Sequence, residues 1–173
     1  MFYLVRHGKT DYSEKNTKIY QGFGVNLSPL SKKGIEDAKK AAGDKCLKKV
    51  KLILSSPYTR ALQTAAILSR KTGAKIIVET DLHEWLADKD YSYVDDEKAE
   101  KRYNSYIAHH GVYPEGKEKK WEDRASLKKR LDGVLSRYQE EGDVAVVCHG
   151  MIIEAATGKK LKTGGIVRYE LSK

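Results

Sequence analysis

The sequence predicts an α/β protein in which helices cover both faces of a mainly parallel central sheet, a three-layer α/β/α sandwich. Short apolar runs of strand-forming residues alternate with longer segments of helical periodicity, the pattern of βαβ units and parallel sheets. The chain has 173 residues and shows neither an internal repeat nor a linker. That length is typical of one domain with a core of its own. We therefore expect residues 1–173 to form a single domain.

The first strand and the first helix are marked near the N-terminus. Residues 2–5 form a short apolar run rich in strand formers, so a buried strand should end near Arg6. Ser31 is suited to cap a helix, and Gly43 is placed to end it. Four apolar residues of that helix are expected to face inward: Ile35, Ala38, Ala41 and Ala42.

The middle of the chain repeats the alternation of strand and helix. Residues 52–54 predict a strand, and Ser56-Pro57 predicts the cap and first turn of the helix that follows. This helix carries small and apolar residues at helical spacing from 61 to 69 and ends near Gly73. Residues 76–78 predict a third strand, so the βαβ pattern is established by this point.

The last part of the chain contains one weak region and two clear strands. From residue 82 to 116 the periodicity weakens, and a helix is indicated only around residues 97–107. A long helix follows and ends by Gly142, and residues 144–147 form a strongly apolar strand. Residues 166–171 alternate partly and predict a final edge strand. The apolar face of the long helix comprises Leu127, Leu131, Val134, Leu135 and Tyr138.

The charge of the chain favours an anionic ligand. The 33 Lys and Arg residues exceed the 24 Asp and Glu residues, so the formal net charge is +9. Such a field attracts small phosphates, acidic proteins and nucleic acid alike. The lysine pairs are scattered and no groove-reading motif lies among them, so we expect no nucleic-acid partner.

Composition also predicts the compartment. No stretch approaches the roughly 20 apolar residues of a membrane-spanning helix, and the candidate site begins at Arg6, which leaves no room for a signal peptide. We therefore expect a cytosolic protein with no membrane partner. Cys46 and Cys148 fit no ligand or redox spacing and are predicted to be free structural thiols.

Three predicted strands end in residues suited to bind phosphate. The first runs into Arg6-His7-Gly8, the second into Ser55-Ser56-Pro57 with Arg60 beyond, and the last into His149-Gly150. Ligands of open α/β sheets collect at the carboxyl ends of the strands. Arginine forks and free helix amides match phosphate oxygens, and neutral imidazole is a nucleophile toward phosphorus. Each residue alone fits an ordinary structural role, and it is their joint occurrence that favours a phosphate pocket.

Four segments in this order resemble the histidine phosphatase superfamily, the phosphoglycerate mutase-like family. Each segment alone is a weak signal, whereas the four together span most of the chain. The resemblance implies the phosphoglycerate mutase-like version of the three-layer fold. The segments are Leu4-Val5-Arg6-His7-Gly8-Lys9-Thr10, Gln21-Gly22 with residues 27–34, residues 55–65 (SSPYTRALQTA), and Val146-Val147-Cys148-His149-Gly150.

The resemblance implies roles for the residues at the strand ends. His7 would be phosphorylated during turnover, while Arg6, Arg60 and His149 would bind the transferring phosphoryl group. Residues 82–85 resemble the stretch that carries the proton donor of many members, which makes Glu84 the candidate general acid. Burial beside a tryptophan would raise its pKa enough for that role. The alternatives are that Glu84 is a surface carboxylate, or that Asp81 or Asp88 is the acid.

The segment after His7 departs from the family pattern. Many members have Asn six residues after the nucleophile, where this chain has Ser13, and Asn16 follows a little further on. The spacing from His7 to Gly22 is about two residues longer than in typical mutases. Ser13, Asn16, Gln21 and Gly22 are therefore assigned to the rim of the substrate pocket. Cys148 stands where a hydroxyl residue often precedes the second histidine.

No metal or other cofactor is expected. His83, His109 and His110 lie near carboxylates but lack the spacing of metal ligands. The tyrosines between Tyr91 and Tyr113 fit either a substrate cleft or an amphipathic lid helix, and their role stays open.

The favoured function is a metal-independent phosphatase that hydrolyses phosphate monoesters through a phosphohistidine on His7. Three alternatives remain: phosphoglycerate mutase-type phosphoryl transfer, a protein phosphohistidine phosphatase, and a non-catalytic phosphate-binding protein. Family mutases use longer insertions than this chain has, and a binding protein would be expected to lose part of the site. A small phosphorylated metabolite is the expected substrate, with a phosphoprotein as the second choice.

Overall fold

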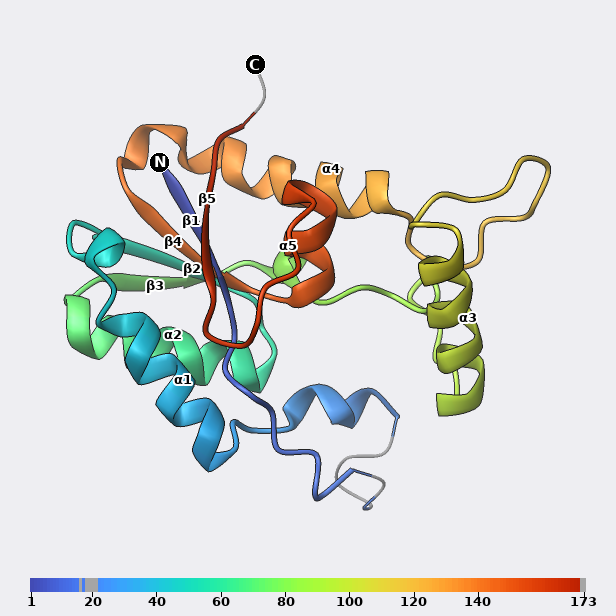
Figure 1. The fold of residues 1–173 in the computed structure, drawn as a ribbon, viewed down its shortest axis with the longest axis horizontal. Helices are drawn as coiled ribbons and strands as arrows, with labels where there is room; N and C mark the ends of the chain where they lie inside the picture. The colour runs from blue at the N-terminus through green and yellow to red at the C-terminus, as the bar shows by residue number, and fades with distance from the viewer. Residues whose placement is uncertain (16, 18–21, 172–173) are drawn as a thin grey trace.

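Five strands form one sheet in the computed structural model of the chain, which describes residues 1–15, 17 and 22–171 (Figure 1). Their order is β3-β2-β4-β1-β5, with the first four parallel and β5 antiparallel to β1 at the edge. The expected mainly parallel sheet and its final edge strand are confirmed. The strands are β1 (Phe2–Arg6), β2 (Leu52–Ser55), β3 (Lys75–Val78), β4 (Val144–Cys148) and β5 (Ile166–Tyr169).

Alternate residues of the strands face two different helical layers. Leu4, Leu54 and Val146 pack under α4 (Arg124–Leu135) and α5 (Gly150–Thr157), on the upper side of the sheet in Figure 1. Their sequence neighbours in the same strands pack against α1 (Lys32–Ala42) and α2 (Thr59–Thr72) on the opposite side. Each such fully buried aliphatic side chain stabilises the fold by about 1.5–3 kcal/mol. The three-layer α/β/α class is therefore confirmed.

Helix α1 begins and ends as expected but presents a different face. Ser31 Oγ accepts a hydrogen bond from the Gly34 amide at 3.1 Å, and Gly43 follows the last helical residue. The prediction for Ile35 is wrong, since its side chain is 38% exposed and Gly34 is buried instead. The cause is a backbone contact: a Cβ on Gly34 would lie 2.0 Å from the Lys9 carbonyl oxygen. Only glycine allows this approach, and the approach sets the rotation of the helix.

Helix α2 starts two residues later than the Ser56-Pro57 motif predicts. Its N-cap is Tyr58, which makes no side-chain capping bond, so the capping role predicted for Ser56 is wrong. The Ser56 hydroxyl instead contacts the imidazole of His149 at 2.7 Å. The hydroxyl is thus committed to a tertiary contact that local sequence does not reveal.

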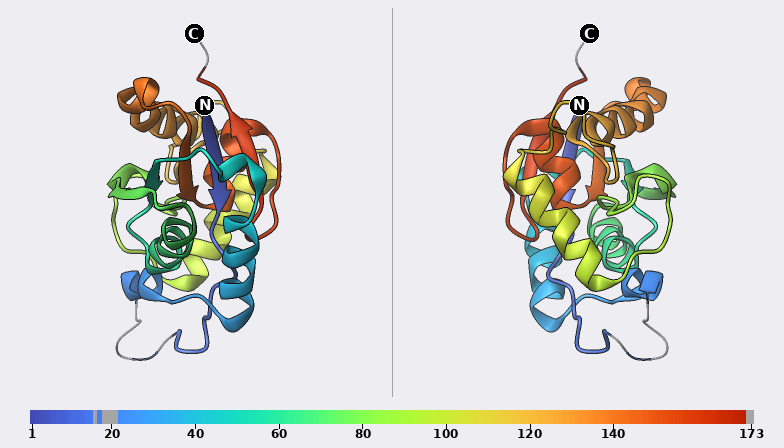
Figure 2. Two further views of the ribbon diagram at one scale, coloured as in Figure 1. Left: turned by 90° about the vertical axis from the view of Figure 1, so that its left-hand side faces the viewer. Right: turned by 90° about the vertical axis from the view of Figure 1, so that its right-hand side faces the viewer.

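The remaining regular structure of the described residues consists of four short 3-10 helices and one α-helix that lies away from the sheet. The weakly predicted helix is confirmed as α3 (Asp96–Ala108), which stands at one end of the molecule and faces the viewer in the right-hand view of Figure 2. The long helix predicted to end by Gly142 is α4, which stops at Leu135 and continues as a 3-10 helix. The 3-10 helices are η1 (Gly22–Leu27), η2 (Lys45–Leu47), η3 (Thr80–Leu82) and η4 (Ser136–Glu141).

Both cysteines are free, as expected. Cys148 is fully buried in the core on the α4 and α5 side, and burial raises the pKa of its thiol to about 12. It is therefore a protonated, unreactive core residue at neutral pH. Within the described part of the chain, no helix is both long and apolar enough to cross a membrane.

Candidate active site

The register of the parallel strands brings three predicted site segments to one edge of the sheet. Arg6 pairs with Cys148, and Ser55 pairs with Val147, so the residues that follow these strands are level. The His7 amide donates to the Cys148 carbonyl at 3.1 Å, and the Ser56 amide donates to the Val147 carbonyl at 3.0 Å. His7, Ser56 and His149 therefore lie side by side at the carboxyl ends of β1, β2 and β4.

The imidazole of His7 is held with one nitrogen protonated and the other bare. Nδ1 lies 2.7 Å from the Gly8 carbonyl oxygen, which only accepts, so Nδ1 carries the proton. Nε2 lies 3.3 Å from the Arg60 Nε–H, which only donates, so Nε2 presents its lone pair. The side chain is 7% exposed. This is the tautomer that attack by Nε2 requires.

The Gly8 peptide that orients His7 is itself held from both sides. Its amide donates to Thr64 Oγ1 at 3.1 Å, and that hydroxyl donates to the Arg60 carbonyl at 2.8 Å. A Cβ on Gly8 would lie 2.1 Å from the Gly34 carbonyl oxygen, so any larger residue would displace the peptide. The glycine after the histidine is thus required by the close approach of α1.

Two arginines flank the imidazole. Arg60, in the first turn of α2, is 5% exposed and lies over the Tyr58 ring at 4.8 Å. Arg6, at the end of β1, donates through Nη1 to the Leu161 carbonyl at 2.6 Å and keeps a buried Nε without a protein partner. Gly150 leaves room for this guanidinium, because a Cβ there would lie 3.2 Å from its central carbon. Buried donors without a partner are what a bound phosphate oxygen would satisfy.

The second histidine has a buried ring nitrogen without a protein partner. His149 is fully buried, and its ring centroid lies 5.0 Å from that of His7 in an edge-on arrangement. Ser56 Oγ accepts from the Tyr58 amide at 3.3 Å and lies 2.7 Å from His149 Nε2. In the tautomer in which Nε2 accepts from this hydroxyl, the ring proton is on Nδ1, a buried atom with no protein partner.

Burial and charge keep both imidazoles neutral. Burial first, then the Arg60 and Arg6 cations, lower the pKa of His7 to about 3. Burial, followed by the electrostatic interactions with His7 and Arg60, holds the pKa of His149 well below its ordinary value. At neutral pH the pocket therefore contains two permanent cations and two uncharged histidines, which suits a phosphate dianion.

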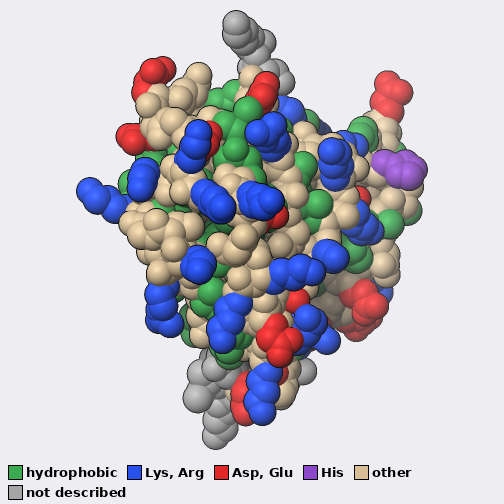
Figure 3. Space-filling model, turned by 60° about the vertical axis from the view of Figure 1, so that its left-hand side comes forward, with side chains coloured by type: hydrophobic (Ala, Val, Ile, Leu, Met, Phe, Trp, Pro, Cys, Tyr) green, Lys and Arg blue, Asp and Glu red, His purple; other side chains and the backbone are tan. Residues whose placement is uncertain are grey.

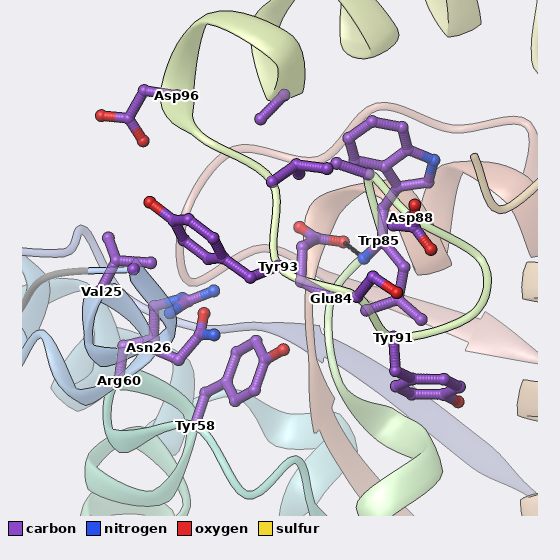
Figure 4. A pocket seen from close by; sticks show the side chains of 16 residues that line it. Val25, Asn26, Tyr58, Arg60, Glu84, Trp85, Asp88, Tyr91, Tyr93 and Asp96 are labelled. Carbon is purple, nitrogen blue, oxygen red and sulfur yellow. Dashed lines mark hydrogen bonds between the residues drawn. The ribbon is translucent and has the colours of Figure 1, made fainter. Parts of the chain in front are cut away.

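A cleft of about 240 Å³ opens from Arg60 toward α3. Figure 4 shows Arg60 and Asn26 on one side of it and Glu84 with Trp85 on the other. Tyr58 and Tyr93 lie between these two sides in the same view. A group bound beside Arg60 would face the Glu84 carboxyl across the cleft.

Glu84 has the environment that a proton donor needs. Part of its side chain is reached from the cleft, but enough protein surrounds it that burial raises its pKa. A hydrogen bond from the Trp85 amide to Oε1 at 2.9 Å opposes this shift, as do the charges of Arg60 and Arg6. The raised pKa keeps a larger share of the carboxyl protonated near neutral pH.

The two alternative acids have environments less suited to proton donation. Asp81 is exposed and does not line the cleft. Asp88 lines the cleft, but a hydrogen bond and ion pair with Arg102 at 2.8 Å lower the pKa of its carboxyl. Asp88 therefore stays ionised where Glu84 is protonated.

The predicted rim residues are only partly brought to the cleft. Gly22 lines it, whereas Ser13 lies in an exposed turn and is not among its lining residues. Asn16 and Gln21 lie outside the described residues. Asn26, Thr64 and Tyr58 were not identified as site residues from the sequence. Of the helix that contains Arg130, only the apolar face was predicted. The sequence makes the tyrosines between Tyr91 and Tyr113 candidates for a substrate cleft, but it does not show that Tyr91 and Tyr93 are the ones that line it.

Positive charge is concentrated in one part of the chain. Residues 30–80 hold 12 Lys and Arg against 4 Asp and Glu, whereas residues 81–143 hold 12 against 16. Figure 3 shows a face on which Lys and Arg side chains are widely spread. This asymmetry adds a long-range attraction for anions to the local pull of the two site arginines.

These features define the class of protein. Two arginines, an unprotonated imidazole nitrogen and a second neutral histidine meet at the strand ends of a three-layer α/β fold, an arrangement suited to binding and transferring a phosphoryl group. Among the residues that the structure describes, no group of three or more His, Cys, Asp and Glu side chains is arranged to hold a metal ion.

The chain belongs to the histidine phosphatase superfamily. The family model for branch 1 of this superfamily matches residues 2–165. A protein of Hydrogenobacter thermophilus named "Putative phosphoserine phosphatase 2" is 40% identical over 83 residues. That alignment covers 47% of this chain and 38% of the relative, so the chain matches well under half of the relative's length.

Solved structures of other proteins have a similar fold. "Mycobacterial hydrolase 1" has a TM-score of 0.64 at 25% identity, covering 89% of this chain and 77% of that one. YhfR of Bacillus stearothermophilus has a TM-score of 0.65 at 23% identity, covering 95% and 88%. A mycobacterial glucosyl-3-phosphoglycerate phosphatase solved with VO3 has a TM-score of 0.63 at 24% identity, covering 89% and 77%. The last two show the shared fold.

Proposed function

We propose that this protein is a metal-independent phosphatase that hydrolyses small phosphate monoesters through a phosphohistidine on His7. The observation that carries the proposal is the locked tautomer of His7, whose Nδ1 is bound to the Gly8 carbonyl and whose Nε2 faces Arg60. The Nε2 lone pair accepts from Arg60, so a phosphoryl group bound to that arginine would lie beside the nitrogen that attacks it.

The reaction would proceed in two steps. Nε2 of His7 forms a bond to phosphorus as the bond from phosphorus to the ester oxygen breaks, and Glu84 protonates the departing oxygen. Water then attacks the phosphohistidine, gives a proton to the Glu84 carboxylate, and releases inorganic phosphate and His7. Arg6, Arg60 and His149 would hold the phosphoryl oxygens in both steps.

The cleft favours a small substrate and hydrolysis over the mutase reaction. Arg60 is the only basic side chain among the described residues that line it. Two cations near the cleft, Arg102 and Lys15, are already paired with the lining carboxylates Asp88 and Asp96. Among the described lining residues, no cation besides Arg60 is therefore left to bind the carboxylate of a phosphoglycerate. The three tyrosines instead suit an uncharged leaving group with apolar surface.

A panel of phosphate monoesters, assayed with a chelator present, tests this function. We expect phosphate release from aryl and alkyl monoesters that the chelator does not reduce, and little reaction with 3-phosphoglycerate. Loss of activity with the chelator, restored by added metal, would refute metal independence. Efficient isomerisation of 3-phosphoglycerate in the presence of its bisphosphate, without phosphate release, would favour the mutase instead.

The pH dependence of kcat/KM is a second expected result. His7 must be neutral to attack, and because its pKa is about 3, no loss of activity is expected near the ordinary histidine pKa of 6.5 as the pH falls. Glu84 must be protonated, so activity is present below its raised pKa and falls as the pH rises through it. Initial rates measured from pH 4 to pH 9 on an aryl ester and an alkyl ester check both limbs, after correction for the phosphate ionisation of the substrate, which lies at about pH 6. An acid limb near 6.5 that remains after this correction would contradict the neutral nucleophile.

A further inference from the structure

The segment that carries Glu84 has little regular structure of its own. Beyond the short helix η3 (Thr80–Leu82), residues 83–86 belong to neither a helix nor a strand. The backbone ladder therefore does not fix the direction of the Glu84 side chain. A proton donor must nevertheless be held within hydrogen-bond reach of the leaving oxygen, so other contacts have to supply that order.

An ion pair behind the cleft supplies these contacts. Arg130 of α4 donates through Nε and Nη2 to the two carboxylate oxygens of Glu122, at 2.7 and 2.9 Å. Its remaining nitrogen, Nη1, donates to the carbonyl of His83 at 2.9 Å and to that of Asp81. The arginine thus binds the backbone on the N-terminal side of Glu84.

Glu122 binds the backbone on the other side. Its Oε2 accepts from the Leu86 amide at 3.2 Å, and its own amide donates to the Leu86 carbonyl at 3.0 Å. Its carbonyl accepts from the Trp85 indole Nε1 at 2.8 Å. Trp85 is the residue whose amide binds the Glu84 carboxyl. The pair and the Glu122 backbone therefore hold residues 83, 85 and 86, which flank Glu84.

Burial makes this arrangement stiff. The two side chains are only 9% and 8% exposed, and they meet through two parallel hydrogen bonds. Removing one partner would leave the other charge buried without compensation, and the two parallel hydrogen bonds are made only in one relative orientation of the side chains. A stability role alone would not require Arg130 and Glu122 to bind both flanks of one short segment.

We propose that the Arg130–Glu122 ion pair is a positioning unit that fixes the Glu84 carboxyl toward the leaving oxygen, an inference that rests on the proposed role of Glu84 as general acid. Neither residue lines the cleft, so both act through the segment they hold. A second, more exposed ion pair of the chain serves as the comparison. Arg137 and Glu79 also form an ion pair, at 2.5 Å, but neither side chain binds residues 83–86.

A double-mutant cycle between Glu122→Gln and Glu84→Gln tests the proposal. The substrates are an alkyl ester, 2-glycerophosphate, which needs a proton donor, and 4-nitrophenyl phosphate, whose leaving group departs readily without one. Glu122→Gln is expected to lower kcat/KM for the alkyl ester roughly 10-fold to 100-fold and for the aryl ester by less than about threefold. In the Glu84→Gln background it is expected to cause no further loss on either ester, because the acid it positions is already gone.

Control variants separate positioning from stability. Glu79→Gln should leave the ratio of the two kcat/KM values at the wild-type level, even if it lowers the melting temperature. Should Glu122→Gln fail to fold, Arg130→Lys replaces it in the same cycle. Lysine keeps the positive charge but cannot make the two parallel hydrogen bonds of the guanidinium.

Each outcome has one meaning. If Glu122→Gln lowers kcat/KM equally for both esters, or if its effect adds to that of Glu84→Gln, the positioning role is wrong. The assignment of Glu84 as general acid is not affected by that result. If Glu84→Gln itself leaves kcat/KM for the alkyl ester unchanged, Glu84 is not the general acid and that part of the proposed function is wrong.

Discussion

Replacing His7 by alanine is expected to lower kcat/KM for phosphate monoesters by at least about 10⁴-fold, because the variant lacks the nitrogen that forms the covalent intermediate. The Gly8 carbonyl and Arg60 hold that nitrogen bare and aimed into a pocket of cations. No other side chain at the site is equivalent, since the neighbouring His149 is fully buried and bound to Ser56. The loss should be the same for aryl and alkyl esters, because both require the attack.

Two measurements check this expectation. Steady-state rates are compared with those of His109→Ala, which replaces an exposed histidine just after the last residue of α3 and should retain wild-type activity. Labelled substrate is also mixed with the protein and quenched rapidly in alkali, which preserves phosphohistidine. The label should be found on His7 of the wild type and be missing from His7→Ala. Substantial turnover by His7→Ala would remove this residue from the mechanism.

Replacing Glu84 by glutamine is expected to lower kcat/KM for alkyl esters by about 10²-fold to 10⁴-fold, the usual contribution of a general acid. The amide keeps the shape of the side chain and its bond from the Trp85 amide, but it has no acidic proton to give. The loss should be much smaller for 4-nitrophenyl phosphate. The fall in kcat/KM at high pH should also disappear, because the group that titrates there is absent.

Asp81→Asn is the matched control for this substitution. Asp81 lies three residues earlier in the same segment, is exposed, and should change neither the rate nor the pH profile. Asp88→Asn tests the remaining alternative acid. If the alkaline limb vanished in Asp88→Asn and persisted in Glu84→Gln, the proton donor would be Asp88.

The elements of the fold were largely predictable because their signals are local. The apolar runs at residues 2–5, 52–54 and 144–147 indicate strands that a parallel sheet buries on both faces, and these three form the centre of the sheet. The errors arose where a distant contact overrides a local preference. Ile35 is exposed because Gly34 meets the backbone near Lys9, and Ser56 does not cap α2 because it contacts His149.

The site residues at the strand ends were also predictable, but their geometry was not. Arg6, His7 and His149 directly follow strand signals, and the parallel order of a βαβ chain carries them to one edge. Glu84 was selected by resemblance in a segment with no periodicity. The residues that hold this segment, Glu122 and Arg130, lie 36 and 47 positions further along the chain from their hydrogen-bond partners.

The sequence was enough to predict the fold class, the candidate phosphate pocket and the candidate nucleophile, because hydrophobic periodicity and the residues at strand ends are properties of short stretches of chain. Only the tertiary structure decided the tautomer of His7, the choice of Glu84 over Asp88 as the better-placed acid, and the ion pair behind it. Those features depend on burial and on hydrogen bonds between residues far apart in the chain, and the pKa values and orientations of the site follow from that packing.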